Sequence, residues 1–138
     1  MKQILLVIAL TFAVILPRPT AAQDGDAGAI QGVISDQFDA FLIEDVETAF
    51  SYASPMIQGL FRSATNFGQM VENGYPMVWA PASTKFLELD ERNGALWQKV
   101  LVQDTGGTFH VLEYKMVQRE GDWLIDGVQL IREAGIGV

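Results

Sequence analysis

The hydrophobic pattern of the chain changes its period near Tyr75, and this change constrains the fold more than any other feature. Between residues 30 and 74, apolar side chains recur at steps of three and four, which places them on one face of an α-helix. From Tyr75 onward they alternate with polar side chains, as in a β-strand with one buried face. Helices followed by strands predict an α+β fold.

The first half of the chain divides into four predicted helices. We interpret Asp24-Gly25-Asp26, which precedes the first of them, as a flexible segment and not a calcium loop, because the remaining calcium ligands are missing. Asp45 supplies negative charge at the start of the second helix. Ser54-Pro55 begins the third, since serine suits the N-cap and proline the first helical position. The predicted helices cover residues 30–42, 46–53, 55–61 and 65–74.

Three turn signals divide the second half into strands. Asn93-Gly94 is the strongest of them, because this dipeptide favours a two-residue hairpin. Asp104–Gly107 and Glu120–Asp122 mark the other two turns. Short turns between consecutive strands predict a four-stranded antiparallel meander, with the helices packed on one face of the sheet.

The alternation assigns side chains to the two faces of this sheet. In the strand over residues 108–119, Tyr114 shares a face with its even-numbered neighbours. In the first strand, Phe86 is expected on the face opposite Leu89. The apolar residues of the last strand change parity at Gly127, which predicts a one-residue bulge at Asp126-Gly127. Because a bulge bends a sheet, we expect a curved, cone-like arrangement with a hollow under the helices.

Residues 1–22 have the order of a secretory signal peptide. Lys2 precedes an apolar run from Ile4 to Leu16, and small residues follow before an expected cut at Gln23. This run is too short to cross a bilayer as a helix, which takes about 20 residues. We expect a periplasmic or secreted protein whose single domain covers residues 23–138, with no membrane span after cleavage. An uncleaved anchor is the alternative.

Composition excludes several classes of function. The net charge is −8, and binding to nucleic acid depends on Lys and Arg that neutralise phosphates, so nucleic acid is not expected as a partner. Cysteine is absent, which excludes disulfides and thiolate metal sites. His110 is the only histidine, and we predict no metal site and no cofactor. No Gly-x-Ser-x-Gly motif or phosphate-binding glycine loop occurs.

Short motifs spread over the chain form a recognisable set: Asp45, Ala49-Phe50, Ala53-Ser54-Pro55, Phe67, Met70-Val71, Tyr75-Pro76 and Asp122–Val128. With these motifs the chain resembles a family of short exported bacterial proteins known only as a domain of unknown function. That family is similar to the nuclear-transport-factor-2-like superfamily, whose cone fold often carries a Trp-x-Ile pattern in its last strand. The superfamily includes ketosteroid isomerases, dehydratases, polyketide cyclases and non-catalytic binding modules, so the resemblance implies a fold and leaves the function open.

Seven side chains are candidates for the wall of the expected hollow. Gln37 lies within an apolar helical stripe, where an unpaired buried amide costs about 1–3 kcal/mol, so it needs a backbone partner or a ligand. His110 is of a residue type that serves as a general acid or base, and a buried Tyr114 needs a hydrogen-bond partner for its hydroxyl. The candidate pocket residues are Gln37, Phe41, Phe86, His110, Tyr114, Trp123 and Asp126.

Three classes of function agree with these observations. The favoured hypothesis is a non-catalytic binding module for an apolar small molecule or lipid, since aromatic residues are abundant and no acid–base pair is recognisable. The second is a cone-fold isomerase or dehydratase that uses Tyr114, Asp126 or His110. The third is a homodimer or accessory subunit formed through the outer sheet face. A void of roughly 300 Å³ or more favours a ligand. The valines expected on the outer face are Val100, Val102, Val111 and Val117.

Overall fold

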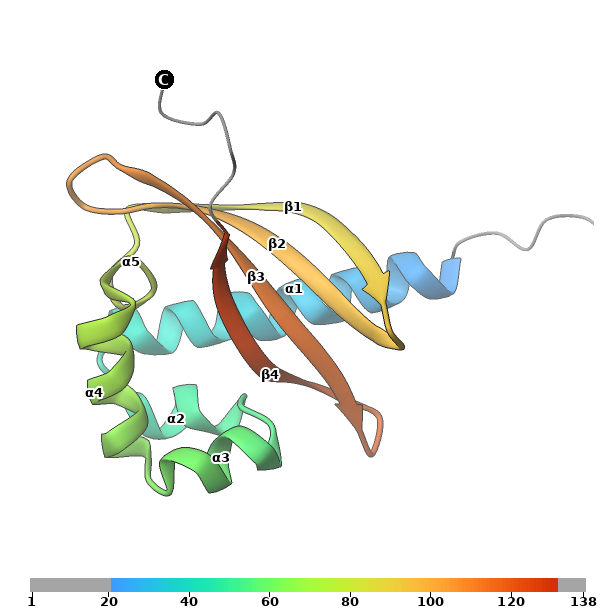
Figure 1. The fold of residues 1–138 in the computed structure, drawn as a ribbon, viewed down its shortest axis with the longest axis horizontal. Helices are drawn as coiled ribbons and strands as arrows, with labels where there is room; N and C mark the ends of the chain where they lie inside the picture. The colour runs from blue at the N-terminus through green and yellow to red at the C-terminus, as the bar shows by residue number, and fades with distance from the viewer. Residues whose placement is uncertain (1–20, 132–138) are drawn as a thin grey trace, which may run out of the picture.

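The protein consists of helices followed by a four-stranded antiparallel sheet, which confirms the predicted α+β class (Figure 1). The computed structural model describes residues 21–131, so nearly all of the predicted signal peptide lies outside the described residues. The helices are α1 (Ala21–Leu42), α2 (Val46–Ser51), α3 (Pro55–Phe61), α4 (Ala64–Gly74) and α5 (Pro76–Trp79). The strands are β1 (Ser83–Arg92), β2 (Ala95–Gln103), β3 (Phe109–Arg119) and β4 (Asp122–Ile131).

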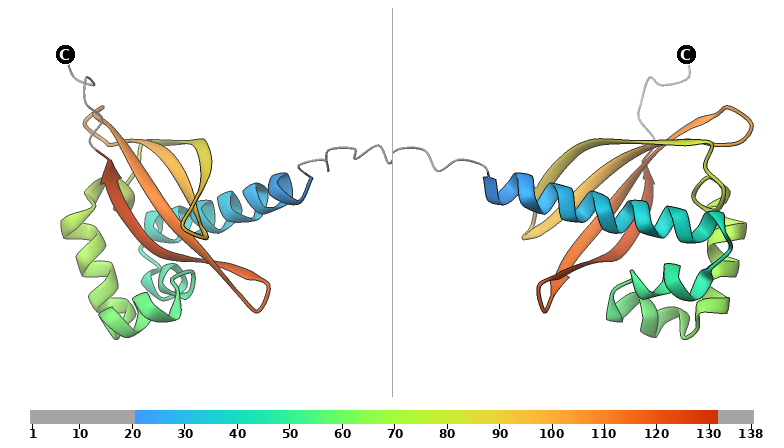
Figure 2. Two further views of the ribbon diagram at one scale, coloured as in Figure 1. Left: turned by 45° about the vertical axis from the view of Figure 1, so that its right-hand side comes forward. Right: turned by 180° about the vertical axis from the view of Figure 1, so that it is seen from behind.

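Helix α1 begins nine residues earlier than the sequence predicted. The segment at 24–26, expected to be flexible, is helical because glycine lowers helix stability by only about 1 kcal/mol per residue and does not forbid a helix. The C-terminal half of α1 crosses one face of the sheet, and its N-terminal part extends past the sheet edge (Figure 2). Ile30, Ile34 and Phe41 anchor α1 through side chains that are at most 1% exposed.

The remaining helices begin at polar caps. Asp45 accepts a hydrogen bond from the Thr48 backbone N–H at 3.1 Å. Ser54 accepts one from the Ile57 backbone N–H at 3.3 Å, as the sequence predicted. Helix α4 is capped by Ser63 and begins slightly earlier than expected. The sequence missed α5, a single turn that starts at a proline and separates α4 from the sheet.

The sheet has the strand order β1-β2-β3-β4, which confirms the meander. Asn93 and Gly94 have φ values of 52° and 78°, and Glu120 and Gly121 have 51° and 86°. Positive φ at both central residues is the requirement of a type I′ hairpin, whose twist matches that of the strands it joins. Both turns therefore fix the register of their hairpins.

The face of the sheet that packs against the helices carries the even-numbered residues of β2 and β3. Val100 pairs with Leu112 and Val102 with His110, and both valines are fully buried. The expectation that Val100 and Val102 lie on the outer face is therefore wrong. Strand β2 has apolar residues on both faces, so its alternation alone did not identify the buried one. Val111 does lie on the outer face, where it is half-buried.

Two bulges bend the sheet. Lys115 pairs with Gly127 and Met116 with Ile125, so Asp126 is the extra residue, and the predicted bulge is confirmed. The second bulge lies in β1, where the register shifts between Phe86 and Leu89. It brings these two side chains to the same face, against the expectation of simple alternation. Gln98 stabilises this bulge through two hydrogen bonds from its Nε2. One goes to the Leu87 carbonyl at 2.9 Å, and the other goes to the backbone carbonyl of the next residue, Lys99, at 2.9 Å.

The segment between α2 and α3 is attached to the edge of β4. The Ser54 N–H donates to the Ile125 carbonyl at 2.8 Å, and the Ile125 N–H donates to the Tyr52 backbone carbonyl at 2.9 Å. Ala53 and Ile125 thus form an isolated parallel bridge directly beside the β4 bulge. This attachment holds α3 and α4 at one end of the sheet, where they enclose a space together with α1 (Figures 1 and 2).

Candidate functional site

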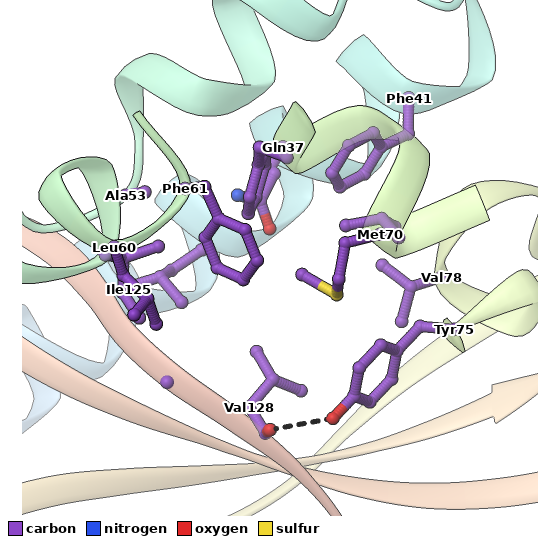
Figure 3. A pocket seen from close by; sticks show the side chains of 14 residues that line it. Gln37, Phe41, Ala53, Leu60, Phe61, Met70, Tyr75, Val78, Ile125 and Val128 are labelled. Atoms are coloured by element: carbon purple, nitrogen blue, oxygen red, sulfur yellow. Dashed lines mark hydrogen bonds between the residues drawn. The ribbon is translucent and has the colours of Figure 1, made fainter. Parts of the chain in front are cut away.

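An apolar cavity lies between the helices and the concave face of the sheet, close to the β4 bulge (Figure 3). Its volume is about 220 Å³. Residues from α1, α3, α4, α5 and β4 line it, together with Ala53 of the segment that bridges to β4 and Tyr75 between α4 and α5. They are Gln37, Phe41, Ala53, Ile57, Leu60, Phe61, Phe67, Met70, Val71, Tyr75, Val78, Ile125, Gly127 and Val128.

Aromatic rings form one wall of this cavity. The ring centroid of Phe67 lies 5.9 Å from that of Phe41 and 5.7 Å from that of Phe61. Phe50 contacts Phe67 from behind at 5.3 Å. Rings at these separations attract one another beyond the area they bury, so this wall is held firmly. None of the lining side chains carries a charge.

Two polar side chains interrupt the apolar lining. Gln37 is 4% exposed, and its Nε2 donates to the Ala49 carbonyl at 3.1 Å. Its amide oxygen points into the cavity (Figure 3). The Tyr75 hydroxyl donates to the Val128 carbonyl at 3.3 Å, at the opposite end of the space. Polar groups that converge in an apolar pocket are the usual means of orienting a ligand.

The mouth of the cavity is beside α3. Leu60 lines the cavity and is also 67% exposed, so the space reaches solvent at this position. No residue of α3 is fully buried, in contrast to α4, which buries four. Among the helices that line the cavity, α3 is therefore the one with the fewest buried side chains.

Only two of the seven predicted pocket residues, Gln37 and Phe41, line this cavity. Phe86 is half-buried and packs against the core opposite Val100 on β2. Trp123 lies over a different hollow of about 350 Å³, between α1 and the β3–β4 turn. Trp123 therefore does not line the apolar cavity.

Tyr114 is sealed in the core and does not reach the cavity. Its side chain is fully buried, and its hydroxyl has no hydrogen-bond partner. Burial raises the pKa of the Tyr114 phenol above its ordinary value, and the nearby Tyr75 raises it further. The phenol therefore stays protonated. Gln98, directly opposite on β2, also has an amide oxygen without a partner.

Asp126 is engaged in a structural contact at the bulge. The Ser54 hydroxyl donates to its Oδ1 at 2.7 Å, while the same hydroxyl oxygen caps α3. Lys115 Nζ lies 3.5 Å from Asp126 Oδ2. The bulged residue thus fastens the start of α3 to the sheet, on the rim of the cavity and not inside it.

His110 lies beside the β2–β3 turn, and its Nε2–H donates to Asp104 Oδ2 at 2.8 Å. This bond, with a second from the Thr108 backbone N–H, holds the pKa of Asp104 below its ordinary value. At about 3.3 Å per residue, the Cα atoms of His110 and Tyr114 are about 13 Å apart along β3. Together with the separate contacts of Asp126, this spacing means that the three proposed acid–base residues do not form one site.

The outer face of the sheet carries a second, polar hollow of about 310 Å³. The Arg92 guanidinium lies 4.7 Å from the centre of the Trp97 ring and forms an ion pair with the buried Glu113. Lys115 Nζ lies 5.9 Å from the centre of the same ring. Because Arg92 and Lys115 already have partners in the protein, their contacts stabilise the sheet and leave little free positive charge for a ligand.

The cavity residues that the sequence analysis missed come mainly from α3, α4 and α5. The helical spacing of Ile57, Phe61 and Met70 predicts that they are buried, but not that they share one cavity. Their convergence depends on the attachment of residues 52–54 to β4, a long-range contact without a local signal.

Within residues 21–131, no three His, Cys, Asp or Glu side chains gather as metal ligands would. Within the same residues, no helix combines the length and the apolar character needed to cross a membrane.

Fold and site together define a class: an α+β protein with an apolar cavity under a helical cover. The chain matches the family described as Domain of unknown function (DUF4864) over residues 23–138, and it belongs to that family. This match confirms the expected resemblance to a domain of unknown function. Comparison with curated proteins and with solved structures found no significant match.

Proposed function

We propose that the protein is an exported, non-catalytic binding module for a small apolar molecule held in the cavity beside α3. The observation that carries this proposal is the cavity itself, whose uncharged, largely apolar wall is interrupted by an inward-pointing amide oxygen. Water gains few hydrogen bonds in such a space, so an apolar molecule is the favoured occupant.

The size of the cavity limits the occupant. An apolar cavity of about 150 Å³ is sufficient for benzene, whereas pockets for drug-sized ligands start near 300 Å³. The 220 Å³ found here is smaller than the roughly 300 Å³ given above as the size that favours a ligand. It agrees with a molecule of one ring or a short chain, and a complete lipid would extend past Leu60 into solvent.

Export is the second part of the proposal. Its support is the order of charged, apolar and small residues over 1–22, and the family match that begins at residue 23, where the expected cut lies. A distant relation to the nuclear-transport-factor-2-like superfamily is also proposed, supported by helices that cover a curved antiparallel sheet and leave a hollow.

Native mass spectrometry of the exported protein, purified from the cells that make it, tests the binding proposal. Val128→Phe is the informative variant, because the Val128 side chain points into the cavity (Figure 3) and a phenyl ring there would occupy the space. Val117→Phe makes the same change on the outer face of the sheet and serves as the matched control.

We expect a small apolar molecule to accompany the wild-type protein and the Val117→Phe variant, and to be absent from folded Val128→Phe. A wild-type protein without any bound molecule, which also fails to take up small aromatic compounds added in excess, would disprove the binding proposal. Detection of the cleaved N-terminus at Gln23 in the same spectra tests export.

A further inference from the structure

The orientation of the Gln37 amide is fixed by its neighbour on α2. Its Nε2 donates to the Ala49 carbonyl at 3.1 Å, and an exchange of the amide oxygen and nitrogen would set two acceptor oxygens against each other. The atom that faces the cavity is therefore the oxygen, as Figure 3 shows. Among the described residues, none donates a hydrogen bond to it.

The second polar group of the lining also presents an acceptor. The Tyr75 hydroxyl uses its only hydrogen in the bond to the Val128 carbonyl, which leaves the lone pairs of its oxygen. No lysine or arginine lines the cavity, so a carboxylate or phosphate inside it would find no positive partner. The cavity thus offers acceptors and no cation.

From this arrangement we infer that the ligand carries a hydrogen-bond donor, a hydroxyl or N–H group, on an otherwise apolar body, and that Gln37 Oε1 accepts this donor. The inference rests on the proposed binding function and names its ligand class: neutral phenols, short alcohols, indoles or amides. A buried acceptor that is 4% exposed gains more from such a donor than from an apolar group, because otherwise it stays unpaired when ligand displaces water.

Three probes of similar size separate the possibilities: phenol has a donor, toluene has none, and benzoate has a negative charge. Their affinities for the wild-type protein and for Gln37→Leu are measured by isothermal titration calorimetry. Gln37→Leu keeps the bulk of the side chain and removes the acceptor. We expect the ratio of phenol to toluene affinity to fall by about tenfold in this variant, the value of one net hydrogen bond, and benzoate to bind neither protein.

A measurement on the wild-type protein covers the case in which Gln37→Leu fails to fold. The carboxamide carbon of Gln37, labelled with ¹³C, should shift downfield when phenol binds and stay nearly constant when toluene binds. The two proposals fail separately. If phenol and toluene both bind, but the ratio and the ¹³C shift do not respond as expected, the donor inference is wrong and the binding function stands. Equal binding of benzoate and phenol also overturns the inference, and failure of every probe to bind overturns both proposals.

Discussion

Replacing Val128 by isoleucine would add one methylene group to a side chain that points into the cavity (Figure 3). Isoleucine keeps the β-branched shape that suits a strand, and the backbone carbonyl of Val128 can still accept the Tyr75 hydroxyl. The substitution therefore tests whether the space beside Val128 is empty of protein atoms, without changing the strand that carries it.

The expected gain follows from the volume. A cavity of about 220 Å³ has room for one further methylene group. Burying one methylene group in this space should raise the free energy of unfolding by about 0.8 kcal/mol. With an m-value of about 1.5 kcal/mol per molar, that gain raises the urea midpoint by about half a molar.

Urea unfolding followed by tryptophan fluorescence measures this change, with Val100→Ile as the matched control. Val100 is fully buried between Phe86 and Leu112, away from the cavity, so the extra methylene there should cost about 1–3 kcal/mol through overpacking. If Val128→Ile destabilised the protein as much as Val100→Ile does, the space would be filled and the reasoning from cavity volume refuted.

Four further substitutions test individual contacts of the fold. Ser54→Ala, which removes the α3 cap and the bond to Asp126, should lower the free energy of unfolding by about 1–2 kcal/mol, and equal stability in urea would contradict the assigned contact. Gly127→Ala should stabilise by about 0.4–1 kcal/mol, because no atom lies within 4 Å of the new Cβ; Gly68→Ala should destabilise, because its Cβ would lie 2.5 Å from a side-chain carbon of α2. The lowered pKa of Asp104 means that its contribution is present above the unfolded-state pKa of about 3.9 and is lost as the pH falls through the lower folded-state pKa. The stability difference between wild type and Asp104→Asn should therefore shrink below about pH 4, and a constant difference would refute the assignment.

Much of the fold could be predicted because its signals are local. The Asn93-Gly94 turn requires positive φ at adjacent residues, which this dipeptide adopts readily, and the structure has that geometry. The bulge at Asp126 was visible as a change of parity within one strand. The Ser54 cap needed only a serine followed by a proline.

The features that the sequence did not predict depend on long-range contacts. The bulge in β1 arises where Leu87 and Glu88 together oppose one residue of β2, and the side chain of Gln98, which stabilises it, is ten or more residues away. The buried face of β2 was misassigned because both of its faces are partly apolar. Gln37 was recognised as unusual in an apolar stripe, but only the position of α2 shows which end of its amide faces the cavity.

A benzene titration observed through ¹³C-labelled methyl groups tests the central claim, that the cavity accepts an apolar molecule. The account predicts saturable shifts at the methyl groups of Met70, Val78 and Val128, which line the cavity. It predicts no saturable shift at Val102, which is fully buried elsewhere in the core. Shifts that do not saturate, or that are as large at Val102 as at the cavity methyls, would contradict the account.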